Sequence, residues 1–409
     1  MVGGGGTPFL PRLLARSLDD ALSVFPVVVI TGARQTGKTT LVRRLDPARA
    51  YLTLDDLDIR DQALSAPDDL LRRAERLTLD EVQRSPDLLL AVKRAVDRDR
   101  RPGRFLLTGS ANLLLSQRIA ETLAGRATYL TLWPLTQGEL SGAGRAGRWT
   151  SLLSRPPREW PDLLGEKNRP VDWKALASRG GYPTPATALP TREQRALWFS
   201  GYTQTYLERD LRDLARIESL VEFRRLMRAA CLRLGNLVNQ TELARDTGIP
   251  RATVQRYLDL LETSYQLLRL EPYSVNRTKR LIKSPKLYWT DTGLALHLGD
   301  EEAPTGAHLE NLILCDLLAW RDAEPARPSV LYWRTAGGEE VDFVLEWRGR
   351  LLAVEVKATP RPTHRDGRHL RTFLDEYGKT GHGALLLHTG GTTEWLSEGV
   401  LSVPWWRVL

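Results

Sequence analysis

A glycine-rich loop is the first segment of the chain whose residue types and spacing suit chemistry. Residues 32–39 read GARQTGKT, which has the G-x-x-x-x-G-K-[ST] spacing of a phosphate-binding loop. The loop follows the β-branched run at 27–30 and precedes periodic apolar residues at 41–45, so strand, loop and helix stand in the required order. In such a loop, backbone N–H groups and the helix dipole hold the phosphates of a nucleotide.

The loop therefore predicts an ATP site with Mg²⁺ as its metal ion. The residues expected to contact the nucleotide are Gly32, Arg34, Gln35, Thr36, Gly37, Lys38, Thr39 and Thr40. We expect Lys38 to reach the β- and γ-phosphates, and Thr39 to bind Mg²⁺. The alternative is a glycine turn before a helix with no ligand, but the flanking strand and helix favour the nucleotide.

Two adjacent carboxylates follow the next apolar run. Residues 77–79 lead directly into Asp80 and Glu81, and a helix is expected to open near Ser85. A phosphate loop needs a second strand that ends in a carboxylate, because the metal ion needs oxygen ligands. We expect Asp80 to bind Mg²⁺ directly or through water, and Glu81 to be the base that orients the attacking water.

A third strand is predicted at 105–108, where FLLT leads into GSAN. A polar group at this point lies beside the γ-phosphate in nucleotide sites built on three strands, so Ser110 or Asn112 is a candidate sensor. Ser110 could equally cap a following helix, and the sequence leaves both interpretations open.

Two β-rich runs near the C-terminus predict a hairpin. Residues 341–347 and 351–357 flank a short Arg-Gly-Arg segment. If the loop has two residues, Trp347 faces Arg350 and Asp342 lies directly opposite Glu355. Side chains alternate along a strand, so Lys357 projects from the same face as Glu355.

Carboxylates that face each other across two strands repel, and a divalent metal ion relieves this repulsion. Asp342 and Glu355 are therefore candidate ligands. Glu310, in the helical stretch 308–320, is a plausible third carboxylate.

Residues 239–262 carry the pattern of a helix-turn-helix. A short helix ends at Gly248, a second begins after Pro250, and the spacing of Ala244, Gly248 and Val254 lets the two cross closely. The second helix would present four side chains to DNA near its start, namely Arg251, Thr253, Gln255 and Arg256.

Residues 265–273 and 286–290 are predicted to be the strands of a wing. Five cations with no acid among them accompany these strands, namely Arg277, Lys279, Arg280, Lys283 and Lys286. Such a cluster repels itself unless an anion is near, and a duplex backbone is the expected partner. The alternative is a winged helix that serves only for packing, with its charges on a solvated face.

Length and composition limit the class of protein. The chain has 409 residues, 58 Lys and Arg against 50 Asp and Glu, and 42% hydrophobic residues. It is too long for one ordinary core and too apolar for a disordered chain, so we expect two or three globular domains. No apolar run approaches the roughly 20 residues that span a bilayer, and we find no signal peptide pattern. Two isolated cysteines argue against a disulfide framework, so a cytoplasmic location is expected.

Seven segments, in order, resemble a prokaryotic family of AAA+-type ATP-binding proteins in which a C-terminal domain of unknown function follows the ATPase core. They are GARQTGKTT, YLTLDD, LDEVQRSPDLL, FLLTGSAN, LAGRATYLTLWPLTQGEL, GGYPTP and YLERDL. The resemblance implies a core with a central parallel sheet, and it makes Arg126 a candidate arginine finger or sensor. A finger supplied by a neighbouring subunit implies a homo-oligomer such as a ring.

The constellation of Glu310, Asp342 and Glu355-x-Lys357 is similar to that of the PD-(D/E)xK nuclease superfamily. The resemblance implies that Asp342 and Glu355 hold Mg²⁺, that Lys357 positions or activates the water, and that Glu310 assists through water. Folds of this kind also persist as binding modules, so an active nuclease is a separate hypothesis.

The predicted protein is α/β and multidomain. It has an AAA+-type P-loop core at 1–140, a loop or insertion and linker at 141–190, a helical segment with a winged helix at 191–300, and a restriction-endonuclease-like domain at 301–409. The leading hypothesis is a DNA-dependent ATPase that remodels, translocates on or processes duplex or branched DNA. A second hypothesis adds metal-dependent DNA cleavage. A third is a nucleotide-switched regulator whose outer domains are docking modules. No membrane partner is expected.

Overall fold

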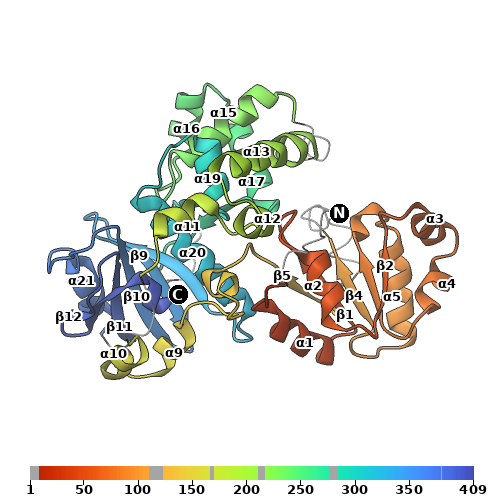
Figure 1. Cartoon of the computed structure of the whole chain (residues 1–409), viewed down its shortest axis with the longest axis horizontal. Helices are drawn as coiled ribbons and strands as arrows, with labels where there is room; N and C mark the ends of the chain where they lie inside the picture. The colour runs from red at the N-terminus through yellow and green to blue at the C-terminus, as the bar shows by residue number, and fades with distance from the viewer. Residues whose placement is uncertain (1–8, 110–122, 166–169, 211–216, 277–283, 379) are drawn as a thin grey trace, which may run out of the picture.

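The structure is a computed structural model that describes residues 9–109, 123–165, 170–210, 217–276, 284–378 and 380–409. Three parts follow one another along the chain (Figure 1). The first is built on a parallel sheet, the second is mainly helical, and the third is built on a mixed sheet. Among the described residues, no helix has the length and apolar character needed to cross a membrane.

The N-terminal sheet has the strand order β2-β3-β4-β1-β5, and its pairs are parallel. The strands are β1 (Val27–Thr31), β2 (Ala50–Thr53), β3 (Leu77–Asp80), β4 (Phe105–Thr108) and β5 (Ala127–Thr131). Helices α1 (Leu14–Val24), α2 (Lys38–Leu45), α3 (Leu57–Ser65), α4 (Pro67–Arg72) and α5 (Leu88–Arg98) accompany it, with a short 3-10 turn η1 (Val82–Arg84). Every residue of β1 is buried, as expected for a central strand covered on both faces. The predicted parallel sheet is confirmed.

The segment at 141–190, predicted as a loop or linker, contains helices instead. The elements there and just before it are α8 (Gln137–Leu140), α9 (Trp149–Ser154), η2 (Pro157–Glu159), α10 (Trp160–Leu163), α11 (Trp173–Arg179) and α12 (Pro183–Thr187). Trp149 and Trp160 are fully buried, and the Trp149 indole donates to Asp316 Oδ1 at 2.6 Å. The prediction was wrong because the buried tryptophans supply apolar packing that orders these short helices despite the Gly, Pro and Arg around them.

The middle part contains two helices joined by a short turn in the region predicted to be a helix-turn-helix. Its elements are α13 (Arg192–Tyr202), the π-helix η3 (Thr203–Asp210), α15 (Leu220–Cys231), α16 (Gln240–Thr247), α17 (Arg251–Thr263), β6 (Leu267–Leu270), β7 (Lys286–Trp289) and α19 (Thr292–Gly299). Helix α16 ends at Gly248, whose φ of 68° is left-handed, and α17 begins after Pro250.

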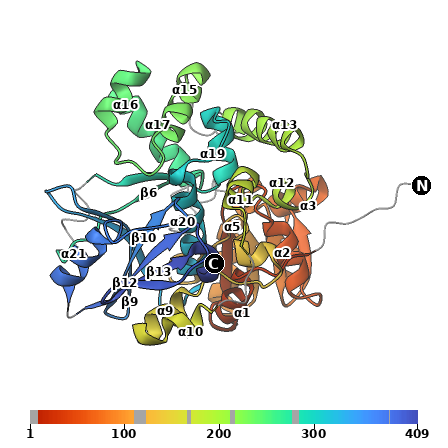
Figure 2. The same cartoon turned by 60° about the vertical axis from the view of Figure 1, so that its left-hand side comes forward.

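The two predicted wing strands form an antiparallel pair, but they are shorter than expected and do not project freely. Strand β7 is buried along its whole length. On its other side it meets residues 235–238, where the Gly235 N–H donates to the Leu287 carbonyl at 2.8 Å. Figure 2 shows β6 lying between helices α16 and α17 and the C-terminal sheet. The apolar side chains of β7 explain its burial.

The C-terminal sheet has six strands in the order β12-β13-β11-β10-β9-β8. The strands are β8 (Ser329–Arg334), β9 (Glu340–Trp347), β10 (Arg350–Lys357), β11 (Gly381–His388), β12 (Glu394–Ser397) and β13 (Val400–Pro404). Helices α20 (Gly306–Ala323), α21 (Arg368–Tyr377) and α22 (Trp405–Val408) complete this part. Strands β9 and β10 pair with Trp347 opposite Arg350, so the predicted hairpin and its register are confirmed.

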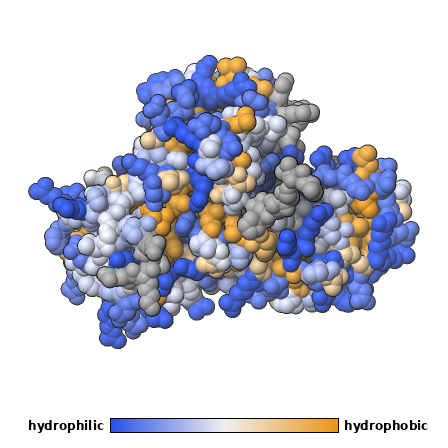
Figure 3. Space-filling model, in the orientation of Figure 1, coloured by the Kyte–Doolittle hydropathy of each residue, from blue (hydrophilic) through white to orange (hydrophobic). Residues whose placement is uncertain are grey.

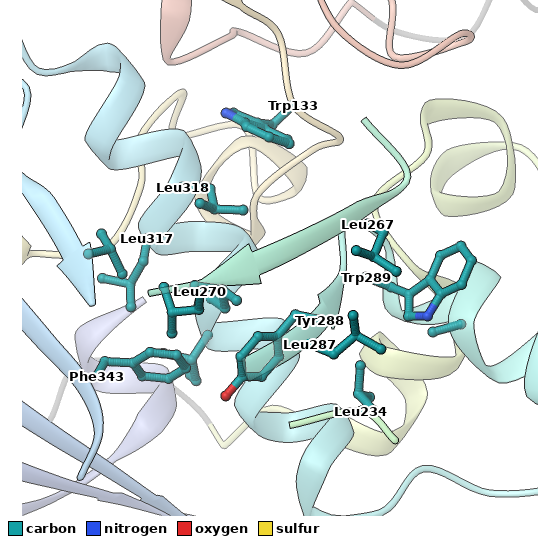
Figure 4. Close-up of a cluster of buried hydrophobic side chains, with 14 of the residues drawn as sticks. Trp133, Leu234, Leu267, Leu270, Leu287, Tyr288, Trp289, Leu317, Leu318 and Phe343 are labelled. Carbon is teal, nitrogen blue, oxygen red and sulfur yellow. The ribbon is translucent and has the colours of Figure 1, made fainter. Parts of the chain in front are cut away.

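One apolar core joins the middle and C-terminal parts. Figure 4 shows Leu270 and Tyr288 of the two-stranded sheet packed near Phe343 of β9, with Trp133 close to Leu318. On the face drawn in Figure 3, hydrophobic side chains gather where the three parts meet. The expected boundary at residue 300 therefore does not separate two independent cores.

Candidate functional site

The phosphate loop leaves β1 at Gly32 and enters α2 at Lys38. A Cβ on Gly32, whose φ is 137°, would lie 2.4 Å from the Leu132 carbonyl oxygen, so two backbones meet where only glycine fits. Gln35 and Gly37 have left-handed φ values of 61° and 94°, which turn the chain into the helix. The loop N–H groups thus lie at a helix start, where an anion is stabilised.

Lys38 is buried inside the loop. Its Nζ donates to the carbonyl oxygens of Gly32 at 3.1 Å and Ala33 at 2.7 Å. Burial lowers the pKa of Lys38 to about 8, although the nearby carboxylates of Glu81 and Asp80 act in the opposite direction. The ammonium is therefore held by the loop carbonyls, near the carboxylates at the end of β3.

Asp80 is the centre of a hydrogen-bond network at the carboxyl ends of the strands. The Thr39 hydroxyl donates to Asp80 Oδ2 at 2.8 Å, and the Tyr51 hydroxyl of β2 donates to the same oxygen. The Thr108 hydroxyl of β4 donates to Oδ1. Burial, followed by the hydrogen bond to Asp80, raises the pKa of Tyr51 to about 12. Thr39 and Asp80 bring hydroxyl and carboxylate oxygens side by side, and this donor set fits Mg²⁺.

Glu81 leaves the strand immediately after Asp80. Its φ of 58° is left-handed, and its carboxylate accepts a hydrogen bond from the Gln83 amide. The Glu81 N–H donates to the Thr108 hydroxyl at 3.3 Å. Two adjacent carboxylates thus have different surroundings, because Asp80 is buried and Glu81 is only half-buried. The sensor candidates Ser110 and Asn112 lie outside the described residues.

A pocket of about 240 Å³ adjoins the phosphate loop. It is lined by Phe9, Leu10, Arg12, Gly37, Thr40, Leu41, Arg44, Leu135, Pro183, Thr184 and Thr187. Arg12 links the N-terminal segment to the phosphate loop and to α8. It donates to the Thr36 carbonyl at 2.8 Å and forms a buried salt bridge with Glu139 at 3.0 Å. The pocket is therefore shared by the N-terminal segment, the loop and α12.

The middle part also contacts the phosphate loop directly. The Tyr265 hydroxyl lies 2.8 Å from the Thr31 hydroxyl, the last residue of β1. The Arg34 guanidinium lies 5.2 Å from the centre of the Tyr206 ring. Tyr265 precedes β6 and Tyr206 lies in η3, so two separate elements of the middle part touch the loop or its base.

Arg126 lies at the amino ends of the strands, whereas the phosphate loop lies at their carboxyl ends. It precedes β5, whose first residue pairs with Val27 at the start of β1. Its Nε lies 2.5 Å from Asp97 Oδ1 on α5. A five-residue strand is about 16 Å long, so Arg126 does not reach the γ-phosphate of its own chain. The sensor role within one chain is therefore wrong, and only the role of a finger in a neighbouring subunit stays a hypothesis.

Some of the side chains predicted to contact DNA are exposed to solvent, and others are packed against neighbouring residues. Arg251 and Arg256 are exposed at the start of α17, whereas Thr253 and Gln255 are half-buried. The Gln255 amide donates to Asp259 Oδ1 at 2.7 Å, so it already has a partner. The wing cations Arg277, Lys279, Arg280 and Lys283 lie outside the described residues. Lys286 is buried, which contradicts its predicted place among the DNA-facing cations.

The C-terminal acids lie near one another at the ends of β9 and β10. The Val356 N–H donates to Asp342 Oδ2 at 2.9 Å, and Lys357 Nζ lies 2.6 Å from Glu355 Oε1. Burial and then the charge of Asp342 raise the pKa values of Glu310 and Glu355. Glu355 Oε2 is buried and has no hydrogen-bond partner among the described residues.

Lys286 enters this acidic cluster from β7. Its Nζ lies 2.6 Å from Glu340 Oε1 and 3.4 Å from both Glu310 Oε1 and Asp342 Oδ1. Burial opposes its charge, but Glu310, Asp342 and Glu340 outweigh burial and raise the pKa of Lys286. In the described part of the chain, no group of three His, Cys, Asp or Glu side chains is placed to hold a metal ion. In this arrangement the predicted ligands Glu310, Asp342 and Glu355 do not fit a divalent ion.

The sequence did not identify Tyr51, Thr108 and Tyr265 as site residues, and it placed Lys286 at the DNA-facing wing and not in the acidic cluster. Thr108 ends a predicted strand beside Asp80, so its position could have been found from the strand pattern. Tyr51 and Tyr265 become neighbours of the loop only through the strand order and through packing of the middle part. No local pattern carries that information.

The sheet, the loop and the Thr39–Asp80 contact define a P-loop ATPase of the AAA class. Residues 24–141 match an AAA domain. Residues 171–305 and 305–408 match two domains of unknown function, DUF8612 and DUF4143. Uncharacterized proteins of Mycobacterium tuberculosis (Rv2008c) and Mycobacterium bovis (Mb2031c) are each 34% identical over 364 residues, which is 86% of this chain and 75% of theirs. The chain belongs to the same family as these proteins.

More distant similarities were also found. An uncharacterized protein of Haemophilus influenzae is 24% identical over 67% of this chain and 64% of its own length. Among solved structures, the Walker-type ATPase PABY2304 of Pyrococcus abyssi is 17% identical, covers 71% of this chain and 99% of its own, and has a TM-score of 0.44. That structural similarity is too low to support a statement about function.

Proposed function

We propose that the protein couples Mg²⁺-dependent ATP hydrolysis to action on DNA. In this proposal Lys38 binds the β- and γ-phosphates, and Thr39 with Asp80 holds Mg²⁺, which neutralises charge on the transferred phosphoryl group. Glu81 orients the attacking water and accepts its proton. The observation that carries the ATPase proposal is the buried network in which Thr39, Tyr51 and Thr108 all donate to Asp80.

The pocket beside α2 is the proposed site of the nucleoside. It adjoins Gly37 and Thr40, and its outer wall comes from α12 of the segment that leads into the middle part. A nucleotide in this position would contact the ATPase core and the segment that leads into the middle part together. Its binding energy can then favour one arrangement of the two parts over another.

The proposed path from nucleotide to middle part runs through the base of the phosphate loop. Tyr265 touches Thr31 and lies two residues beyond α17. The Tyr265 carbonyl also accepts a hydrogen bond from the Thr290 hydroxyl at 2.6 Å, directly after β7. A movement of the loop would therefore be passed through Tyr265 to both the helix-turn-helix and the two-stranded sheet.

DNA is the proposed partner of the helix-turn-helix. The order of α15, α16, α17, β6 and β7 supports a winged helix, and α17 exposes Arg251 and Arg256 near its start. Guanidinium groups there suit phosphates and base edges. The burial of β7 favours the alternative in which this module docks other parts of the protein and the nucleotide acts as a switch.

A homo-oligomer is the proposed working form. The proposal rests on Arg126, which is partly exposed at the amino ends of the strands, the end far from its own phosphate loop. Such an arginine could complete the site of an adjacent subunit and stabilise charge in the transition state.

Cleavage of DNA is a second candidate function. It is favoured by the confirmed register of β9 and β10, which brings Asp342, Glu355 and Lys357 to one end of the hairpin. It requires a divalent ion, and therefore an arrangement of Lys286 different from the one described.

Nucleotide-dependent DNA binding tests the main proposal. Fluorescence anisotropy of labelled linear, forked and four-way DNA is measured with ADP and with a non-hydrolysable ATP analogue. We expect the dissociation constant to differ between the two nucleotides for wild type, and not for Lys38→Ala. Binding that is absent in both nucleotide states would favour the docking alternative.

A further inference from the structure

A buried cation lies among the acids of the C-terminal part, and the side chain that carries it belongs to the middle part. Only 3% of the Lys286 side chain is exposed, and the side chains of Glu310 and Asp342 are 14% and 12% exposed. Glu340, at 26%, forms the outer side of the cluster and is also 3.0 Å from Arg334 Nη1. The ammonium is thus enclosed by three carboxylates from two elements of the C-terminal part.

The remaining contacts fix both the lysine and the acids. The Tyr288 hydroxyl, two residues along β7, donates to the same Glu310 oxygen that faces Lys286. Lys286 Nζ lies 5.8 Å from the centre of the Tyr332 ring on β8. The second oxygen of Asp342 is occupied by the Val356 N–H. Strands β7, β8 and β10 thus each contribute one contact that fixes the lysine or an acid of the cluster.

Strand β7 is itself anchored to the C-terminal sheet. The Tyr273 N–H donates to the Tyr332 carbonyl, and the Tyr332 N–H donates to the Glu271 carbonyl at 3.0 Å. The Tyr332 hydroxyl donates to the Ser284 carbonyl, two residues before Lys286. The hydrogen bonds at Glu271 and Tyr273, after β6, and at Ser284, just before β7, therefore tie the two-stranded sheet to β8 beside the cluster.

Carboxylates that are buried close together repel one another and are stabilised by a cation, and an ammonium and a divalent ion compete for the same oxygen lone pairs. Mg²⁺ requires oxygen ligands at about 2.0–2.1 Å in octahedral geometry, whereas an ammonium is satisfied at hydrogen-bond distance. With Lys286 between Glu310 and Asp342, a divalent ion there would meet a positive charge within a few ångströms. The two occupants exclude each other.

We propose that Lys286 is the resident cation of this cluster, that it occupies the Asp342 oxygen that a divalent metal ion would need, and that it locks the two-stranded sheet onto the C-terminal part. Glu310 and Asp342 are thereby neutralised from within the chain. The inference concerns regulation of the second candidate site: if that site cleaves DNA, it becomes competent only when β7 withdraws Lys286.

Mn²⁺ binding to nucleotide-free protein, measured by calorimetry and by the rise in melting temperature, tests this lock. The proteins are wild type, Asp342→Asn, Lys286→Met, Lys286→Met with Asp342→Asn, and Lys174→Met, which removes an exposed lysine as the control. We expect wild type and the control to show no Mn²⁺ site that depends on Asp342. Lys286→Met should gain such a site at least about tenfold tighter than any binding by wild type, because uncompensated buried acids remain. The double variant should lose that site.

Binding of Mn²⁺ by wild type that Asp342→Asn abolishes would overturn the lock, and this arm needs no folded Lys286 variant. Failure of folded Lys286→Met to gain Mn²⁺ binding would also overturn it. DNA cleavage is followed separately in the same proteins. A Lys286→Met variant that binds Mn²⁺ and cleaves no DNA would leave the lock standing and reject the nuclease.

Discussion

Thr39 and Asp80, 41 residues apart in the chain, are joined by a hydrogen bond of 2.8 Å between Oγ1 and Oδ2. The contact brings the first residues of α2 to the end of β3 and makes one site from two sequence motifs. Tyr51 and Thr108 then fix the Asp80 carboxylate from the strands on either side of β3.

The first prediction concerns the residues that orient Asp80. Asp80→Asn should lower kcat for ATP hydrolysis by about 100-fold or more, because an oxygen that holds Mg²⁺ is lost. Tyr51→Phe should lower kcat by about tenfold and leave nucleotide affinity almost unchanged, since it removes only an outer hydrogen bond. Steady-state kinetics and nucleotide binding measure both effects.

Tyr129→Phe is the matched control for Tyr51→Phe. Tyr129 lies on the same sheet, and its hydroxyl has no hydrogen-bond partner among the described residues. Equal kinetic effects of the two substitutions would show that Tyr51 acts through general packing and not through Asp80.

The second prediction concerns Arg126. Arg126→Ala should reduce turnover by about 10³-fold and leave ATP binding nearly intact, because a finger acts on charge in the transition state. Arg101→Ala removes an exposed arginine that precedes β4, as Arg126 precedes β5, and it should have little effect on turnover. In mixtures with Lys38→Ala protein, Arg126→Ala should regain turnover, since each variant lacks a different half of a shared site. Unchanged turnover of Arg126→Ala alone would reject the finger.

The parts of the site that residues close together in sequence define could be predicted, whereas the parts that depend on tertiary packing could not. The loop from Gly32 to Thr39 and the two-residue turn after Trp347 are defined by neighbours in sequence, so their geometry was predicted correctly. Lys286 shows the limit of that approach. The charged residues that precede it in sequence are cations, whereas the charged residues around it in space are acids from α20 and β9. The interpretation as a wing cation failed because only tertiary packing supplies those acids.

The third prediction concerns Arg251 and Arg256. Replacing both by Ala should weaken DNA binding and make the dependence of affinity on salt shallower, by about one unit of log–log slope for each phosphate that the variant no longer binds. Arg72→Ala with Arg76→Ala removes the same charge from exposed positions of the ATPase part and is the control. Equal losses in the two double variants would indicate general electrostatic attraction and not a site on α17.

The fourth prediction is a pH dependence that comes from Asp316. Its Oδ1 accepts hydrogen bonds from the Gly147 N–H and the Trp149 indole, but burial dominates and raises its pKa to about 6, from 3.8. The folded state therefore binds the proton more tightly than the unfolded state. This contribution to stability is complete below pH 3.8 and is lost as the pH rises through about 6.

Asp316→Asn removes the titration. The free energy of unfolding of wild type, relative to this variant, should fall by on the order of 3 kcal/mol between about pH 4 and pH 7. Chemical denaturation of both proteins at several pH values measures it. A difference that stays constant over this range would show that Asp316 has the same protonation in both states.

The rate of ATP hydrolysis with and without DNA tests the central claim most directly. Wild type and Lys38→Ala are compared with linear, forked and four-way DNA at several salt concentrations. We expect wild type to hydrolyse ATP, to be stimulated by at least one DNA structure, and to lose that stimulation as salt rises, because phosphate contacts weaken. Lys38→Ala should be inactive throughout. A wild-type rate that no DNA structure changes at any salt concentration would contradict the account and favour a nucleotide-switched docking protein.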